Sequence, residues 1–294
     1  MENRLRDLTI PTNYTLQKTG ITQSLLSTFL TCRVMFLLSL NKYYIPTQSK
    51  ALHFGNLIHA MLEQYYTTGK YSIDKWKDDE IRLDAQEVER QKAVATPLLK
   101  IYKRVYPKET FKSVEETFQF DFNGFKLNIK IDGVTDDLTY LIDHKTSSKI
   151  NEEDLMDKLS FDFQSLFYII AMETEDNSFK GAYNNVIRRP EHKQKDLSLK
   201  DFQKRIENEI IKNPDHFYKR FKIPFTKGEK KRYADELKYK LDEVQMVLEG
   251  RLHIFKSEGH CITGWGACKF LKVCASGNLS FCKRRKKLFP ELNL

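Results

Sequence analysis

The chain has 294 residues, of which 40% are hydrophobic, so it can bury one substantial core with a small appendage. A formal net charge of +9 favours a polyanionic partner, nucleic acid before membrane, although many basic proteins bind neither. Arg33 and several Ser and Thr residues interrupt the most apolar stretch, residues 21–40, which argues against a membrane span. The opening residues do not form a signal peptide, so we expect a soluble protein of the cytoplasm.

Apolar periodicity predicts both helices and strands. In chain order these are helices over 21–38, 55–67 and 74–104, strands over 117–122, 125–134 and 140–145, a helix over 151–173, a strand over 181–187, and helices over 198–212 and 229–256. A strand meander set between groups of helices predicts an α/β fold, with a sheet under helical cover. A basic run at 283–287 follows the last helix.

The most informative segment is 129–148, in which two alternating apolar runs flank a polar turn at 135–137 and so predict a β-hairpin. Antiparallel strands can place Asp132 beside Asp143. The two-residue period of a strand then puts Asp143 and Lys145 on one face. Two carboxylates beside an ammonium group suit magnesium-dependent cleavage of a phosphodiester. The alternative is a solvated hairpin end with a surface ion pair.

Two residue pairs on predicted helices have the i, i+4 spacing that places side chains on one face. The first is His59 with Glu63, and a lone histidine on such a helix is more often structural than functional. The second is Gln164 with Tyr168, an amide and a phenol that can hydrogen-bond a phosphate or a base. In the alternative, Tyr168 belongs to the core and Gln164 is solvated.

Taken together, the motifs resemble those of the RecB-like branch of the PD-(D/E)xK nuclease superfamily. The matching motifs are G-x-x-x-H at 55–59, Asp132, Asp143-x-Lys145 and Gln164-x-x-x-Tyr168. The resemblance spans residues 24–274, and the second motif departs from the usual Pro-Asp by reading Ile-Asp-Gly. It implies a restriction-endonuclease-like core built on a mixed central sheet.

The resemblance also implies roles. The residues that would hold one or two Mg²⁺ or Mn²⁺ ions are His59, Asp132, Asp143 and the backbone carbonyl of His144. Such an ion lowers the pKa of a bound water and neutralises charge on the scissile phosphate. Lys145 would orient that water or stabilise the transition state, and Glu63 would steady His59 or a metal-bound water. Gln164 and Tyr168 would position the DNA strand.

The five cysteines suggest metal binding or buried thiols, because a reducing compartment disfavours disulfides. Cys261, Cys268 and Cys274 form C-x6-C-x5-C, and Cys32 stands near the N-terminus. This arrangement resembles the [4Fe–4S] staple of AddB and of RecB-like CRISPR-adaptation exonucleases, including phage-borne members. Such a cluster would fasten the C-terminal segment to the first helix. A zinc site is the main alternative, followed by unliganded thiols, and Cys282 could replace Cys261.

Basic and aromatic residues would complete a DNA path. Arg188, Arg189 and the basic tail can neutralise phosphates, and Tyr65, Tyr66 and Phe167 can stack bases. The alternatives are a solvated tail and aromatic residues packed in the core. The expected layout is one nuclease domain over 1–294, with a core at about 50–190, a helical and cysteine-containing cap from 20–40 with 195–282, and a tail at 283–294.

The predicted function is metal-dependent exonuclease activity, with the preference for single-stranded DNA ends implied by the resemblance. It would serve recombination, repair, replication or CRISPR adaptation, and a helicase, recombination or adaptation protein is a candidate partner. One alternative is a metal-dependent endonuclease of the same fold. Another is a DNA-binding or assembly protein that does not cut. Digestion polarity, the choice between DNA and RNA, and the oligomeric state stay open.

Overall fold

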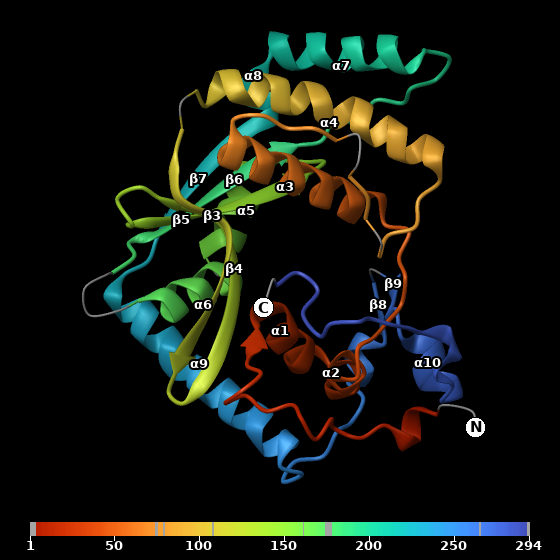
Figure 1. The fold of residues 1–294 in the computed structure, drawn as a ribbon, viewed down its shortest axis with the longest axis vertical. Coiled ribbons are helices and arrows are strands. Elements are labelled where there is room, and N and C mark those ends of the chain that lie inside the picture. The colour runs from red at the N-terminus through yellow and green to blue at the C-terminus, as the bar shows by residue number, and fades with distance from the viewer. Residues whose placement is uncertain are drawn as a thin grey trace.

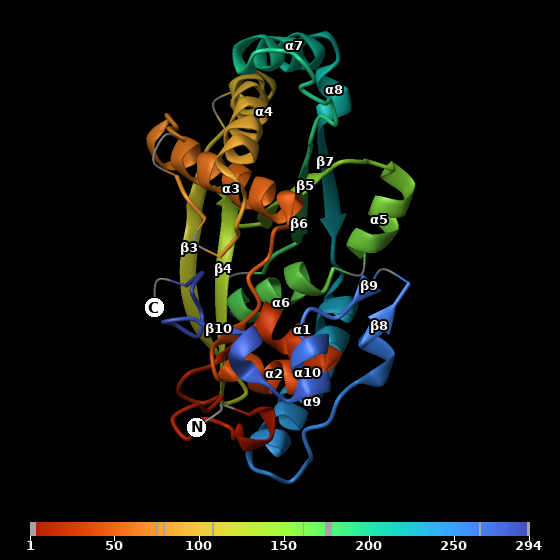
Figure 2. The same ribbon diagram turned by 90° about the vertical axis from the view of Figure 1, so that its right-hand side faces the viewer.

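The structure, a computed structural model, describes residues 4–73, 76–78, 80–107, 109–160, 162–173, 178–264 and 266–292. A six-stranded mixed sheet lies at its centre, with helices packed against both faces (Figure 1 and Figure 2). The predicted α/β class, a mixed sheet under helical cover, is therefore confirmed. Within the described part of the chain, none of the helices combines the length and apolar character needed to span a membrane.

The sheet has the strand order β1-β4-β5-β6-β7, and β3 also pairs with β4. Its strands are β1 (Ile21–Thr22), β3 (Phe111–Phe122), β4 (Phe125–Thr135), β5 (Tyr140–Ser147), β6 (Gly181–Arg188) and β7 (Tyr218–Pro224). β3, β4 and β5 are antiparallel neighbours, which confirms the predicted hairpin. β6 runs parallel to β5, β7 runs antiparallel to β6, and β1 runs parallel to β4.

Strand β4 changes neighbours along one of its edges. That edge pairs with β1 at Leu127 and Asn128, and with β5 at Gly133 and Val134. The opposite edge pairs with β3 along most of its length. Among the described residues, the stretch of β4 between the two pairings has no strand partner on the divided edge. Asp132 lies in this stretch, at a fork in the sheet.

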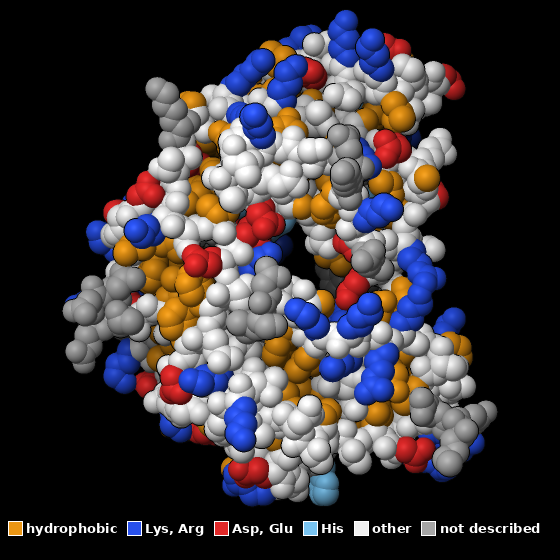
Figure 3. Space-filling view, in the orientation of Figure 1, with side chains coloured by type: hydrophobic (Ala, Val, Ile, Leu, Met, Phe, Trp, Pro, Cys, Tyr) orange, Lys and Arg blue, Asp and Glu red, His pale blue; other side chains and the backbone are white. Residues whose placement is uncertain are grey.

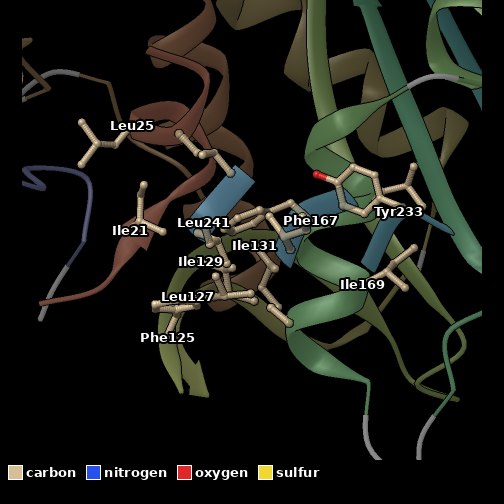
Figure 4. Packing of buried hydrophobic residues seen from close by; sticks show 14 of the residues in the cluster. Ile21, Leu25, Phe125, Leu127, Ile129, Ile131, Phe167, Ile169, Tyr233 and Leu241 are labelled. Atoms are coloured by element: carbon tan, nitrogen blue, oxygen red, sulfur yellow. The ribbon is translucent and has the colours of Figure 1, made fainter. Parts of the chain in front are cut away.

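The helices form a layer on each side of the sheet. They are α1 (Gln23–Thr31), α2 (Arg33–Leu40), α3 (Lys50–Thr68), α4 (Ala85–Val105), α5 (Glu152–Ser160), α6 (Phe163–Met172), α7 (Leu199–Lys212), α8 (Pro214–Phe217), α9 (Lys227–Leu248) and α10 (Leu271–Ser276). α1, α6 and α9 enclose the largest core with β4, where Ile129, Ile131, Phe167 and Leu241 meet (Figure 4). α3, α4 and α7 enclose a second core with the end of β6.

The chain after α9 returns to the N-terminal helices. Cys32, Val34 and Leu38 form a small third cluster with Phe270, Val273 and Leu279. Close by, the short strand β10 (Lys283–Arg284) pairs with β2 (Tyr43–Tyr44), and β8 (Ile262–Thr263) pairs with β9 (Gly266–Ala267). The C-terminal segment therefore packs against the beginning of the chain, as Figure 2 shows.

Two expectations about local structure were wrong, and one strand was missed. The helix predicted over 21–38 is two helices, because Cys32 has an extended backbone between α1 and α2. The helix predicted over 151–173 is likewise divided into α5 and α6, and Phe161 between them lies outside the described residues. Strand β7 was not anticipated, although it pairs with β6 along its whole length.

Candidate active site

The helix α3 brings His59 to the sheet. Ser49 caps its first turn by accepting a hydrogen bond from the Leu52 N–H, and Leu57 and Ile58 are fully buried in the second core. Gly55 lies one turn before His59, against β5. A Cβ atom at Gly55 would lie 3.3 Å from Thr146 Oγ1. The glycine of the G-x-x-x-H motif thus permits a close approach of α3 to β5.

At the fork in the sheet, a side chain takes the place of a strand as the hydrogen-bond partner of the backbone. The Asp132 carboxylate accepts a hydrogen bond from the His144 N–H through Oδ2, at 2.6 Å. This contact replaces a ladder bond between β4 and β5 and ties the two motif strands together. Ile131 and Val134 belong to the same buried cluster, although strict alternation would place them on opposite faces. The break in alternation coincides with Asp132.

An acidic residue that the sequence interpretation missed faces Asp132 from β3. Glu115 has φ = 50°, a left-handed conformation that non-glycine residues rarely adopt in a strand. Its Oε1 lies 3.7 Å from His59 Nδ1, while Asp132 Oδ1 lies 3.5 Å from the same nitrogen. One donor atom from each of the three residues lies within 4.8 Å of the others, a spacing that one metal ion could bridge.

No clear signal in the sequence could have selected Glu115. Glu115 is followed directly by Glu116, and only the backbone conformation decides which of the two side chains points into the site. Glu116 is exposed, whereas the Glu115 side chain is 6% exposed and Lys130 Nζ lies 2.6 Å from its Oε2. Local strain of this kind persists where the surroundings over-determine it, and it clusters at functional sites.

The third predicted acid, Asp143, is buried beside this group. Lys145 Nζ donates to its Oδ1 at 2.9 Å and to Gln164 Oε1 at 2.8 Å, and Gln164 Nε2 donates to the Tyr168 hydroxyl at 3.2 Å. Asp162 caps α6 by accepting from the Gln164 and Ser165 N–H groups. The structure thus brings the D-x-K and Q-x-x-x-Y motifs into one hydrogen-bonded chain.

Electrostatics at the site depend on how the charges are buried. Burial lowers the pKa of His59, but the carboxylates of Asp132 and Glu115 outweigh it and hold that pKa well above its usual value. Burial also raises the pKa of Asp132, yet His59 and the His144 N–H bring it well below its usual range. Burial and the neighbouring Asp132 raise the pKa of Asp143 to about 7 against the opposing effect of Lys145.

These residues fit a divalent cation. Among the described residues, Oδ2 of Asp143 and Oε1 of Glu115 are buried without a hydrogen-bond partner. Buried carboxylate oxygens need such a partner or an ion, and oxygen ligands suit Mg²⁺ and Mn²⁺. The imidazole of His144 is buried on the other face of β5, where Nδ1 accepts from Asn185 Nδ2 at 2.9 Å. Burial lowers its pKa to about 3, so the ring is neutral.

A cavity of about 570 Å³ opens onto the site. His59, Asp132, Gln164 and Tyr168 line it, together with the predicted supporting residue Glu63. Burial, then the nearby Glu115, raises the pKa of Glu63. Of the predicted hairpin residues, Asp132 lines this cavity, whereas Asp143 and Lys145 are linked to it through the hydrogen bond from Lys145 to Gln164.

The cysteines also converge. Burial raises the pKa of the Cys274 thiol, and Cys32, Cys268 and Cys261 raise it further. Burial and then Cys274 raise the pKa of Cys282. All five thiols are free of disulfides, and Cys268, Cys274 and Cys282 pack against the cluster that contains Cys32. Cys261 and Cys282 thus both lie near Cys274.

Parts of the predicted DNA path were wrong. Phe167 is fully buried in the largest core and cannot stack a base. The Tyr66 hydroxyl donates to Glu109 Oε2 at 2.7 Å, and its partly buried ring packs against the second core. In the tail, Arg285 pairs with Glu80, and the last two residues lie outside the described part. Arg189 lines a separate cavity of about 320 Å³ with Phe54 and Arg90.

A mixed sheet that carries a D-x-K motif beside a second acid and a histidine is the arrangement expected of a metal-dependent nuclease. Residues 21–275 match the family model of the PD-(D/E)XK nuclease superfamily, and the chain belongs to this superfamily. Nucleases of this superfamily use divalent metal ions.

A crystal structure of a "putative exonuclease" from Eubacterium rectale is similar in fold. Its TM-score is 0.53 at 13% sequence identity, with 85% of this chain and 90% of that chain covered. No curated protein sequence matches the chain.

Proposed function

We propose that the protein is a Mg²⁺- or Mn²⁺-dependent exonuclease of the RecB-like branch that hydrolyses single-stranded DNA from its ends. The observation that carries the proposal is the convergence of His59, Glu115 and Asp132 beside the linked pair Asp143 and Lys145. A histidine from the helix before the sheet is the feature that the resemblance associates with this branch. The similar fold of a protein named as an exonuclease is consistent with it.

The residues that would hold the cation are His59, Asp132, Asp143 and Glu115. A divalent cation held there lowers the pKa of water and neutralises charge on the scissile phosphate. His59 must give up its proton to serve as a ligand, so metal binding and proton release are linked. Asp143, whose pKa burial raises to about 7, must likewise be ionised to bind the cation.

Lys145 is placed to act on the reacting groups. Its ammonium is fixed between Asp143 and Gln164. Burial lowers its pKa, but the carboxylates of Asp143, Asp162 and Asp132 together raise it above its usual value, so it stays charged. A fixed cation of this kind stabilises negative charge that develops on a phosphate without reorganising during the reaction. Gln164 and Tyr168 line the cavity and offer hydrogen bonds to the DNA strand.

For the cysteines we propose a structural [4Fe–4S] cluster held by Cys32, Cys261, Cys268 and Cys274, with zinc as the lesser alternative. The proposal is supported by the packing of Cys268 and Cys274 against the cluster that contains Cys32, and by the effect of Cys32, Cys268 and Cys261 on the pKa of Cys274. A cluster held from both ends closes a very long loop, so its binding free energy would contribute directly to folding.

Digestion of end-labelled linear single-stranded DNA with Mg²⁺ or Mn²⁺ tests the proposal, with Lys145→Ala as the inactive variant. Lys231→Ala is the matched control, because Lys231 is exposed on α9 and, among the described residues, pairs with Asp235 in the next turn. We expect wild type and the control to release short products from an end, and Lys145→Ala to release none. Equal digestion by all three proteins would refute the assignment of the active site. Internal cuts would indicate an endonuclease instead of an exonuclease.

A further inference from the structure

Three adjoining cavities lie across α3 from the active site. The first is the cavity of about 320 Å³ that Phe54 of α3 lines, whereas Asn56, two residues further on, lines the active-site cavity. Residues two apart on an α-helix are about 200° apart around its axis, so the two cavities lie on nearly opposite sides of α3. The other two, of about 510 Å³ and 250 Å³, adjoin the first, because His192 lines all three.

Positive charge without a counter-charge gathers in the lining of these cavities. The cations are Arg189 and Lys193 at the first cavity, and Lys204, Arg205 and Lys212 of α7 at the second. Within the described part of the chain, none of them pairs with a carboxylate. Of the acids in the linings, Glu209 pairs with His192, Asp201 accepts a hydrogen bond from the Ser198 hydroxyl, and Glu191 is the third. We call this lining the basic surface.

The row of cations on α7 is long enough to follow a phosphate backbone. Lys204 and Lys212 are eight residues apart, which is about 12 Å along an α-helix. Phosphates of one strand of B-form DNA are about 3.4 Å apart along the helix axis, so the row spans about three or four of them. In Figure 3, Lys and Arg side chains gather at the top of the molecule, over α7 and α4. Charge concentrated in this way attracts a polyanion.

The character of the lining favours duplex DNA over a single strand or a protein. Sites for single strands offer exposed aromatic rings to the bases, but the two phenylalanines here, Phe54 and Phe217, are 1% and 2% exposed. Protein interfaces have an apolar core. The large hydrophobic side chains that are exposed on the described part of the chain line none of the three cavities. What the basic surface offers is contacts to phosphates, which hold a duplex without reading its sequence.

We propose that the basic surface binds the double-stranded DNA that adjoins the single-stranded end being cut. This inference rests on the proposed nuclease function and adds the form of its substrate, a duplex with a single-stranded overhang. α3 stands between the basic surface and the metal site, and an α-helix with its side chains is about 10–12 Å across. The overhang must therefore span at least this distance, which leaves the duplex outside the active-site cavity.

Binding of two DNAs tests the basic surface. One is a single strand, and the other is the same strand carried as an overhang on a duplex of about 20 base pairs, two helical turns. Both are measured on the Asp143→Asn background, so that cutting does not consume them. We expect the overhang DNA to bind about tenfold more tightly. Its affinity should also fall more steeply with salt, because each phosphate contact adds about 1 to the slope of log K against log salt.

Charge reversal locates the effect. Lys204→Glu with Arg205→Glu reverses two exposed cations of α7 and should remove the advantage of the overhang DNA, lowering its salt slope by about 2. Arg189→Glu, at the first cavity, should reduce the advantage as well. The matched control is Lys231→Glu with Lys238→Glu, because both lysines are exposed on α9 and the change in net charge is the same. It should keep the advantage. Each protein is compared with itself on the two DNAs, so a partly unfolded fraction cancels.

Several outcomes would overturn the inference. Equal binding of the two DNAs, or an advantage that survives both reversals, would exclude a duplex on the basic surface. Affinities lowered equally for both DNAs would make it a path for the single strand instead. In each of these cases, digestion of single strands by wild type would leave the nuclease function standing. Failure of wild type to bind or cut any DNA would overturn the proposed function, and this inference with it.

Discussion

The buried Asp143 predicts an unusual dependence of stability on pH. Its folded-state pKa of about 7 lies above the ordinary value of 3.8. The folded protein therefore binds more protons than the unfolded chain between these two values. By linkage, the metal-free protein loses stability as pH rises through this window. Asp143→Asn keeps the shape of the side chain and stays neutral, so it removes this loss.

The size of the effect follows from the shift. One pKa unit corresponds to about 1.4 kcal/mol, so wild type should lose about 4 kcal/mol relative to Asp143→Asn as pH rises from about 4 to about 7. A change of 1 kcal/mol moves the melting temperature of a chain of this size by roughly 2 °C. The difference in melting temperature between the two proteins should therefore change by about 8 °C.

Thermal unfolding in a chelator, at pH values from 4.5 to 8, measures this difference. Comparing the two proteins at each pH cancels the other titrating groups. Added Mn²⁺ should stabilise wild type more at pH 8 than at pH 6, because the ion binds the ionised carboxylate. It should stabilise the variant much less. A melting-temperature difference that does not change with pH would refute the assigned environment of Asp143.

Three further outcomes are expected. Glu115→Gln should weaken Mn²⁺ binding at least tenfold in calorimetry, whereas the exposed neighbour in Glu116→Gln should leave it unchanged; equal affinities would remove Glu115 from the site. Lys145→Ala should lower kcat about 10²–10³-fold with Mn²⁺ affinity retained, and near-normal turnover would contradict its role. Cys268→Ser should lose bound iron and melt earlier, while Cys282→Ser keeps its iron; iron-free wild type prepared anaerobically would exclude the cluster.

The sequence was sufficient to predict the hairpin and the contact between its side chains. Strand alternation, the polar turn and the D-x-K spacing are local patterns, and they correctly placed Asp143 beside Lys145. The i, i+4 rule likewise placed Gln164 beside Tyr168. The order of the motifs predicted that segments far apart in the chain share one site, and the structure places His59 beside Asp132.

Features set by long-range contacts escaped prediction. The position of Glu115 depends on a left-handed residue within a strand, which its neighbours impose. The basic tail was expected to bind DNA, but Arg285 is paired with a carboxylate 205 residues away in the chain. Phe167 was a candidate for base stacking, but it packs in the core, which was the alternative. These contacts cannot be predicted from composition and motif spacing alone.

The most direct test of the metal site is a crystal structure of the protein with Mn²⁺, using anomalous scattering to locate the ions. We predict an anomalous peak among the carboxylates of Asp132, Asp143 and Glu115, within coordination distance of His59. Data collected at the iron edge from the same crystal should add a second peak beside Cys274. Manganese found only elsewhere on the surface, with the carboxylates of Asp132 and Asp143 empty, would contradict the account of this protein as a metal-dependent nuclease.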